Sequence, residues 1–232
     1  MLLTVQAYAR PVIIAVIDTG FAYNIESLPE KHLCKYGHKD FSNDQKWAKY
    51  LDTVDRVPLD RNGHGTNIVG VIDKTANGGN YCFVIIKWFG GGVGSKENDN
   101  SAGQAMKYAA SLNPDIINIS AGGPDFDKTE YEAVEKYLNN GGILVAAVGN
   151  NNKDLGIKGN TFYPAMYDKR IIVVGNKEKN GERYFNSNYG KPVKNWEVGV
   201  GVEAFGITGS GSSQATAIRT GKIVKRMKWT TK

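Results

Sequence analysis

Four polar residues could together attack a carbonyl group, and each stands at the predicted end of a buried strand or start of a helix. Asp18 ends the apolar run VIIAVID, and His64 lies between two glycines in NGHGT. Asn150 follows the run ILVAAVG, and Ser213 lies in GSGSSQATA, where the last predicted helix begins. An acid, a base, an amide donor and a hydroxyl are the groups that nucleophilic catalysis by serine requires.

Each of these residues also has an ordinary structural explanation. Asp and Asn often begin a turn after a strand, His64 could be a surface residue at a helix cap, and Ser210, Ser212 and Ser213 could be N-caps. In the catalytic interpretation, the imidazole of His64 accepts a proton near neutral pH. Free N–H groups in the first turn of a helix would stabilise negative charge on an oxygen. If His64 is the base, activity falls as the pH drops through about 6–7.

The elements that must bring these residues together are short apolar runs separated by helical periodicity. This alternation predicts an α/β domain with a mostly parallel sheet, in which ligands bind beyond the carboxyl ends of the strands. Residues 21–61, 151–169 and 176–197 are polar and are predicted to be loops or insertions. The predicted strands are Val12–Ile17, Cys82–Phe89, Asp115–Ile119, Ile143–Val148 and Ile171–Val174, and the predicted helices are Ser101–Leu112, Lys128–Leu138 and the run after Ser213.

Composition limits the classes of protein that this chain can be. It has 232 residues, 41% of them hydrophobic, which suits one domain with a full core. Its two cysteines, Cys34 and Cys82, are expected to be reduced and to pack as small apolar groups. His32 and His38 lack the setting of His64 and are expected at the surface of a loop. The net charge is +6 but is spread along the chain, so no nucleic-acid partner is expected.

No apolar run approaches the ~20 residues of a membrane span, and no leader pattern begins the sequence. We therefore expect no membrane partner and a cytoplasmic location, with secretion after removal of a leader left open. The oligomeric state is open too. Basic residues gather near the end of the chain and are expected to form a solvated helix face that suits the negative end of the helix dipole. They are Lys222, Lys225, Arg226, Lys228 and Lys232.

Five motifs in a fixed order resemble those of the subtilisin-like serine proteases, the subtilases. VIDTG is similar to the Asp motif of that family, NGHGT to the His motif and INISAGG to the strand that lines the substrate cleft. AAVGNN resembles the motif of the oxyanion Asn, and GSSQATA resembles the Ser motif. The resemblance runs from about residue 11 to 226. It implies a three-layer α/β fold, with a mostly parallel central sheet flanked by helices, and a serine endopeptidase acting on peptides or proteins.

The resemblance also implies a role for each matching residue. Asp18 corresponds to the triad acid, His64 to the general base and Ser213 to the nucleophile. Asn150 corresponds to the side-chain donor of the oxyanion hole, shared with the backbone N–H of Ser213. An extended substrate would add a strand along one wall of the specificity pocket. That wall is Ser120, Ala121 and Gly122, and the opposite wall is Ala147, Val148 and Gly149.

The sequence departs from the family pattern at several places. Ala217 stands where the family has a proline, and Asn67 stands where a second histidine is common. The segment from Val71 to Tyr81 is too short for the loop that binds a structural calcium in related enzymes. We expect no required cofactor and no metal ligands, although Asp and Asn residues in 40–55 leave a structural calcium open. Residues 1–232 are expected to form one catalytic domain without a separate pro-domain.

Two other functions stay open. One is a subtilase-like scaffold that binds peptides without cutting them, whose mark would be a lost triad residue, and none is lost. The other is a nucleotide-binding domain, suggested by FGGGVGS at 89–95. That stretch has neither the GxGxxG spacing nor a GK[ST] sequence, so it is a weak signal.

Overall fold

The structure is a computed structural model that describes residues 10–22, 32–42, 57–90 and 99–227. Within these residues, seven parallel strands form one sheet, in the order β2-β3-β1-β4-β5-β6-β7. The strands are continuous apolar runs because both faces of the sheet are covered. They are β1 (Val12–Asp18), β2 (Lys39–Asp40), β3 (Tyr81–Lys87), β4 (Ile116–Ile119), β5 (Ile143–Ala147), β6 (Ile172–Asn176) and β7 (Asn195–Glu197).

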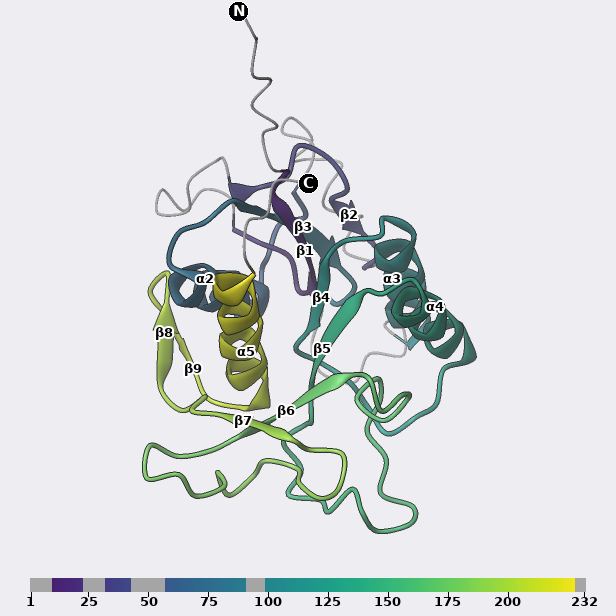
Figure 1. Ribbon diagram of the computed structural model, residues 1–232, viewed down its shortest axis with the longest axis vertical. Coiled ribbons are helices and arrows are strands. Elements are labelled where there is room, and N and C mark those ends of the chain that lie inside the picture. Colours follow the sequence, from purple (N-terminus) through teal and green to yellow (C-terminus); the bar gives the residue numbers. More distant parts are fainter. Residues whose placement is uncertain (1–9, 23–31, 43–56, 91–98, 228–232) are drawn as a thin grey trace, which may run out of the picture.

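Helices cover the two faces of the sheet in pairs (Figure 1). On one face α2 (His64–Ala76) packs against α5 (Ser212–Arg226), and on the other α3 (Asp99–Ser111) packs against α4 (Lys128–Asn139). Successive strand residues alternate between these faces. Ile14 therefore belongs to the core beneath α2 and α5, and Ala15 to the core beneath α3 and α4. The expected three-layer α/β fold is confirmed.

The predicted elements agree with the observed ones to within two residues at each end. The sequence does not predict β2 and β7, which are two and three residues long. It also does not predict the hairpin of β8 (Val202–Ala204) and β9 (Ile207–Gly209). Strands this short carry no recognisable periodicity. Among the described residues, no helix has both the length and the apolar character needed to cross a membrane.

The expectation that both cysteines are reduced is wrong in this structure. Cys34 and Cys82 form a disulfide across a sequence separation of 48. The segment before β2 runs along β3, where the N–H of Cys34 donates to the carbonyl of Phe83 at 3.0 Å. This backbone pairing brings Cys34 beside Cys82, and nothing in the spacing of two cysteines predicts it.

The same segment explains why the surface assignment of His32 and His38 is also wrong. His32 is buried, and its Nδ1 lies 2.7 Å from a carboxylate oxygen of Asp73 in α2. His38 donates from Nε2 to the carbonyl of Cys34 and accepts at Nδ1 from the N–H of Ile85. Burial lowers the pKa of His38 below its ordinary value. His32 thus fastens the loop to α2, and His38 fastens it to β3.

Two other expectations concern the loops and the chain end. Lys222, Lys225 and Arg226 are exposed near the end of α5, as expected, while Lys228 and Lys232 lie outside the described residues. The glycine-rich stretch 89–95 is described only at 89–90, and most of the 40–55 segment, which was considered for calcium, also lies outside.

Candidate active site

The four residues singled out by their chemistry line one open pocket of about 460 Å³ at the carboxyl edge of the sheet. Asp18 is the last residue of β1, and His64 is the first residue of α2. Asn150 lies three residues beyond β5, and Ser213 is the second residue of α5. Their shared location follows from the topology, because parallel strands end at the same edge and their connections begin there.

Asp18 and His64 are in direct contact. The Nδ1 atom of His64 lies 2.7 Å from Oδ1 of Asp18, and the same oxygen accepts from the N–H of Thr19 at 2.8 Å. Asp18 is buried, with 3% of its side chain exposed, whereas His64 is half-buried and faces the pocket. The buried carboxylate therefore fixes which imidazole nitrogen carries a proton and leaves Nε2 for other partners.

The charge of Asp18 is the main reason that the pKa of His64 is raised above its ordinary value. Burial acts in the opposite direction, and the hydrogen bond that His64 donates to Asp18 and the charge of Asp60 add to the increase. A nearby carboxylate thus favours the imidazolium form, which is the form that a general base reaches after it accepts a proton.

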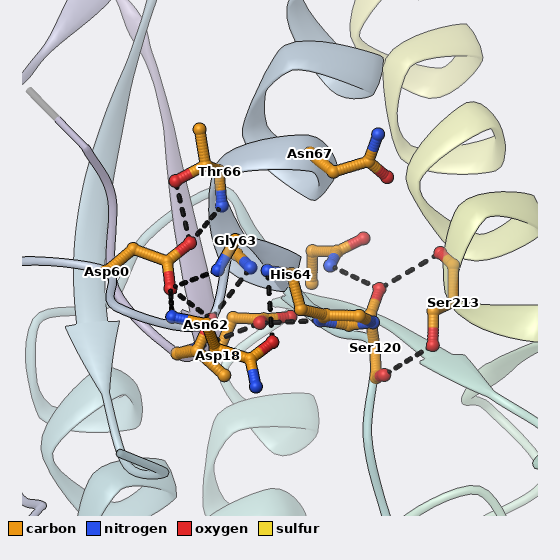
Figure 2. Close-up of polar contacts among 12 residues, drawn as sticks. Asp18, Asp60, Asn62, Gly63, His64, Thr66, Asn67, Ser120 and Ser213 are labelled. Carbon is orange, nitrogen blue, oxygen red and sulfur yellow. Dashed lines mark hydrogen bonds and ion pairs between the residues drawn. The ribbon is translucent and has the colours of Figure 1, made fainter. Parts of the chain in front are cut away.

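Asp60, which the sequence analysis did not select, holds the loop before His64 in place (Figure 2). Its buried carboxylate accepts hydrogen bonds from the backbone at two consecutive loop positions, from the side chain of Thr19 just after β1, and from the backbone and side chain of Thr66 in α2. Oδ1 accepts from Thr19 Oγ1, Asn62 N and Gly63 N at 2.9 Å each, and Oδ2 accepts from Thr66 N at 2.8 Å and Thr66 Oγ1 at 2.6 Å. The signal in the sequence is an Asp three residues before a glycine in a polar turn.

The start of α2 also lies unusually close to the end of β1. The N–H of Gly65 donates to Thr19 Oγ1 at 2.8 Å, and a Cβ atom added to Gly65 would lie 2.3 Å from the carbonyl oxygen of Gly20. Only glycine permits this approach. The Gly-His-Gly sequence therefore lets the imidazole reach the carboxylate of Asp18.

Ser213 lies in the pocket, but its hydroxyl does not point to His64 in this structure. Its Oγ donates to the carbonyl of Ser120 at 2.8 Å, and the hydroxyl of Ser120 donates back to the carbonyl of Ser213 at 3.1 Å (Figure 2). Among the described residues no hydrogen bond joins Ser213 to His64. The structure thus brings the predicted acid and base together and places the predicted nucleophile in the same pocket, but the hydrogen bond from Ser213 to His64 is not formed.

A buried polar chain behind Ser120 ties this pair to the rest of the fold. Asn118, in β4, donates from Nδ2 to the hydroxyl of Ser120 at 3.1 Å. Thr220, two turns along α5 from Ser213, donates to Oδ1 of Asn118 at 2.7 Å. Because these side chains are fully or almost fully buried, the chain fixes the start of α5 against the end of β4.

Asn150 is held by the same helix start. Its Oδ1 accepts from the N–H of Ser212 at 2.9 Å, which leaves Nδ2 as the end of the amide that can donate into the pocket. The hydroxyl of Ser212 accepts from the N–H of Gly149 at 3.2 Å. Ser213 is in the first turn of α5, so its own N–H has no partner within the helix. Two N–H donors therefore lie near one edge of the pocket.

Of the six residues expected to form the walls of a specificity pocket, five line the pocket and one does not. Val148 is fully buried in the core on the α3 and α4 side and makes no part of the lining. The residues that line the pocket are Ser120, Ala121 and Gly122 on one side and Ala147 and Gly149 on the other. Phe162, for which the sequence offered no signal, also lines it.

The departure from the family pattern at Asn67 has a structural role. Asn67 accepts at Oδ1 from Gln214 of α5 at 3.0 Å and donates from Nδ2 to the carbonyl of Ile207 at 2.7 Å. It therefore joins the helix of His64, the helix of Ser213 and the β8–β9 hairpin. Ala217 is fully buried in α5. Within the described ranges, no group of three or more His, Cys, Asp or Glu side chains could hold a metal ion.

The chain belongs to the subtilase family, because the model of the "Subtilase family" matches residues 9–228. The major intracellular serine protease of Bacillus subtilis (strain 168) is 30% identical over 187 residues, which cover 78% of this chain and 55% of that protein. The thermophilic serine proteinase of Bacillus sp. (strain AK1) is 32% identical over 222 residues, covering 88% of this chain and 49% of that protein. This chain thus spans about half the length of these curated relatives.

Solved structures confirm the fold. A cold-adapted subtilisin-like serine proteinase superposes with a TM-score of 0.72 at 23% identity, covering 93% of this chain and 75% of that one. The nisin leader peptidase NisP of Lactococcus lactis superposes with a TM-score of 0.73 at 20% identity, covering 94% of this chain and 78% of that one. The three-layer arrangement is therefore that of subtilisin-like proteins.

Proposed function

We propose that this protein is a serine endopeptidase that hydrolyses peptide bonds through Asp18, His64 and Ser213, with Asn150 in the oxyanion hole. The observation that carries the proposal is the 2.7 Å contact between His64 and the buried Asp18, in the pocket that Ser213 also lines. Membership of the subtilase family supports the same reaction.

The proposed reaction begins with a rotation of Ser213. A serine hydroxyl has three staggered positions about its Cα–Cβ bond, and the one in this structure is bonded to the carbonyl of Ser120. In another position it would donate to Nε2 of His64. The imidazole then takes the hydroxyl proton as Oγ attacks the scissile carbonyl, and it later protonates the leaving amine. Asp18 keeps the imidazole in the required tautomer and stabilises the imidazolium.

The negative charge that develops on the carbonyl oxygen needs donors that are already in place. Asn150 Nδ2 and the N–H of Ser213 would supply them, because Oδ1 of Asn150 is already occupied by Ser212. The proposed substrate is a peptide or protein bound in an extended conformation along Ser120–Gly122. No metal or cofactor takes part in these steps.

Labelling with a small fluorophosphonate, followed by peptide mapping, tests the proposal. We expect the label on Ser213 together with loss of casein cleavage, and Ser213→Ala should lower kcat by about 10⁶-fold, as loss of the nucleophile does in subtilisin. Ser210→Ala is the matched control, because Ser210 is exposed in the same glycine-rich stretch and outside the pocket lining. A label on Ser212, or cleavage retained by Ser213→Ala, would reject the assignment.

A catalytically silent peptide-binding scaffold is the second candidate. The hydroxyl of Ser213 points to Ser120 instead of His64, but this position is one of three staggered ones, and membership of the subtilase family supports the peptidase. Calorimetric binding of a casein-derived peptide without labelling or cleavage would support the scaffold and exclude the peptidase.

The cytoplasmic location stays a prediction. Intracellular serine proteases of Bacillus subtilis and Paenibacillus polymyxa are among the relatives. The disulfide between Cys34 and Cys82 argues against a reducing compartment, because such bonds persist mainly in oxidising ones. The test is to isolate the protein from its own cells under rapid acid quenching and to count its free thiols. Two free thiols are expected for a cytoplasmic protein, and none for a protein in an oxidising compartment.

A further inference from the structure

An aromatic ring occupies the space between the two walls of the pocket. A Cβ atom added to Gly122, in one wall, would lie 2.6 Å from Cε1 of Phe162. A Cβ atom added to Gly149, in the opposite wall, would lie 2.5 Å from Cε2 of the same ring. The ring is therefore sandwiched between two glycines. No space for even a methyl group is left between it and either backbone.

The ring is held firmly in this position. The next residue, Tyr163, pairs with Gly123 through two backbone hydrogen bonds of 2.7 and 3.0 Å, and the hydroxyl of Thr161 donates to the carbonyl of Pro124 at 2.7 Å. Phe162 is thus fastened on both sides to the segment that follows the Ser120–Gly122 wall. Its ring also belongs to the core beneath α3 and α4.

Phe162 also remains part of the pocket surface, where 9% of the residue is exposed. In the proposed reaction, the scissile carbonyl lies beside Ser213 and Asn150. The side chain of the residue that supplies this carbonyl, here called the acyl-side residue, then points between the two walls. The ring of Phe162 lies between these walls and forms the floor on which that side chain would rest.

We propose that Phe162 restricts the acyl-side residue of the substrate to glycine, alanine or serine. This inference rests on the proposed peptidase function and deepens it by naming a substrate class. A larger side chain would have to displace a ring that is packed between two glycines and anchored through its neighbours. Moving it would open a gap in the core, which is unfavourable in a close-packed interior.

The test compares peptides that differ only at the acyl-side residue, with alanine in one and phenylalanine in the other. We expect the unaltered protein to have a kcat/KM at least 10-fold higher for the alanine peptide. Phe162→Ala should reverse this order and raise kcat/KM for the phenylalanine peptide at least 100-fold. Phe185→Ala is the matched control, because Phe185 is 68% exposed and outside the pocket lining, and it should leave the ratio unchanged.

A second measurement does not depend on the folding of a variant. Peptide aldehydes that end in alaninal or phenylalaninal should inhibit the unaltered protein with at least a 10-fold preference for alaninal. Two results would overturn the role of Phe162, provided that Ser213 still takes the fluorophosphonate label. One is a preference for phenylalanine in either assay, and the other is an active Phe162→Ala variant with an unchanged ratio of kcat/KM values for the two peptides. Absence of that label would instead overturn the peptidase proposal and this inference with it.

Discussion

His64 Nδ1 and Asp18 Oδ1 lie 2.7 Å apart, and this contact sets the protonation behaviour of the pocket. The charge of Asp18 raises the pKa of His64 above its ordinary value, with a further increase from Asp60. A general base must be neutral to accept a proton, so activity should fall as the pH drops through a value above 6.5. The sequence alone placed that fall at about 6–7.

The pH dependence of kcat/KM, measured with an alanine-containing peptide from pH 5 to 9, checks this prediction. Asp18→Asn should lower activity by about 10⁴-fold and move the remaining inflection to lower pH, because it removes the main cause of the raised pKa. Asp125→Asn, an exposed acid, should change neither. A profile that stays flat down to pH 5 would contradict the role of His64. The stability that the raised pKa supplies is largest in acid and is lost as pH rises through that pKa, opposite to activity.

Asn150→Ala should lower kcat by about 10²–10³-fold with little change in KM, as loss of one oxyanion donor does in subtilisin. The reason is that Nδ2 acts on charge that exists only in the transition state. Steady-state kinetics with the alanine peptide measure the effect, and Asn180→Ala, in an exposed loop, is the control. A change confined to KM would mean that Asn150 only binds the substrate.

Asp60→Asn should destabilise the protein and lower the pH at which activity is lost. Replacing one carboxylate oxygen by an N–H donor removes the acceptor for Thr66 or for the loop N–H groups, at a cost of about 1–3 kcal/mol. Thermal melting should shift by about 2–4 °C per kcal/mol in a chain of this size. Asp125→Asn again serves as the control. An unaltered melting temperature and pH profile would show that the loop before His64 does not depend on Asp60.

Removing the disulfide should weaken folding by about 4 kcal/mol, the chain-entropy value for a loop closed across a sequence separation of 48. The measurement is guanidinium unfolding of the oxidised protein with and without dithiothreitol, beside the double variant Cys34→Ser, Cys82→Ser. The reductant should lower the midpoint of the unaltered protein and leave that of the variant unchanged. Equal midpoints for the oxidised protein and the variant would contradict the bond.

Glu130 should make the folded state less stable as the pH rises. Burial raises its pKa from 4.5 to about 7, so between these values the folded state holds a proton that the unfolded chain releases. The loss reaches about 3 kcal/mol above pH 7, from the difference between the two pKa values. Glu130→Gln should keep the hydrogen bond from Tyr167 and melt at a higher temperature than the unaltered protein at pH 8.

The control for this prediction is Glu132→Gln on the same helix, where the side chain is 64% exposed. It should have little effect at either pH 5 or pH 8. If Glu130→Gln melts at the same temperature as the unaltered protein at pH 8, the carboxyl group is not held in its neutral form by burial.

The sheet could be predicted from local patterns, whereas the pairing of Asp18 with His64, 46 residues apart, was predicted because their motifs resemble those of the subtilases. Continuous β-branched runs are typical of strands buried on two faces, and a polar residue at the end of such a run must lie at the ligand-binding edge. The glycines on both sides of His64 permit a close approach, and a Cβ atom added to Gly65 would lie 2.3 Å from the carbonyl oxygen of Gly20.

The parts that could not be predicted depend on contacts between distant segments. The pairing of Cys34 with Cys82 requires a loop to lie along β3, and a polar loop carries no periodicity that fixes its path. The position of the Phe162 ring depends on the pairing of Tyr163 with Gly123, which lies 40 residues earlier in the chain. The direction of the Ser213 hydroxyl is one of three staggered positions, and no sequence motif distinguishes among them.

The helices that carry His64 and Ser213 share one face of the sheet and pack against each other, while α3 and α4 occupy the other face (Figure 1). This division has a consequence for protein engineering. Variants of higher thermostability could be selected by randomising exposed residues of α3 and α4, while the helices that carry His64 and Ser213 stay unchanged. If the stabilised variants keep the original kcat/KM and all their substitutions lie on that surface, then stability and catalysis can be changed separately on the two faces of the sheet.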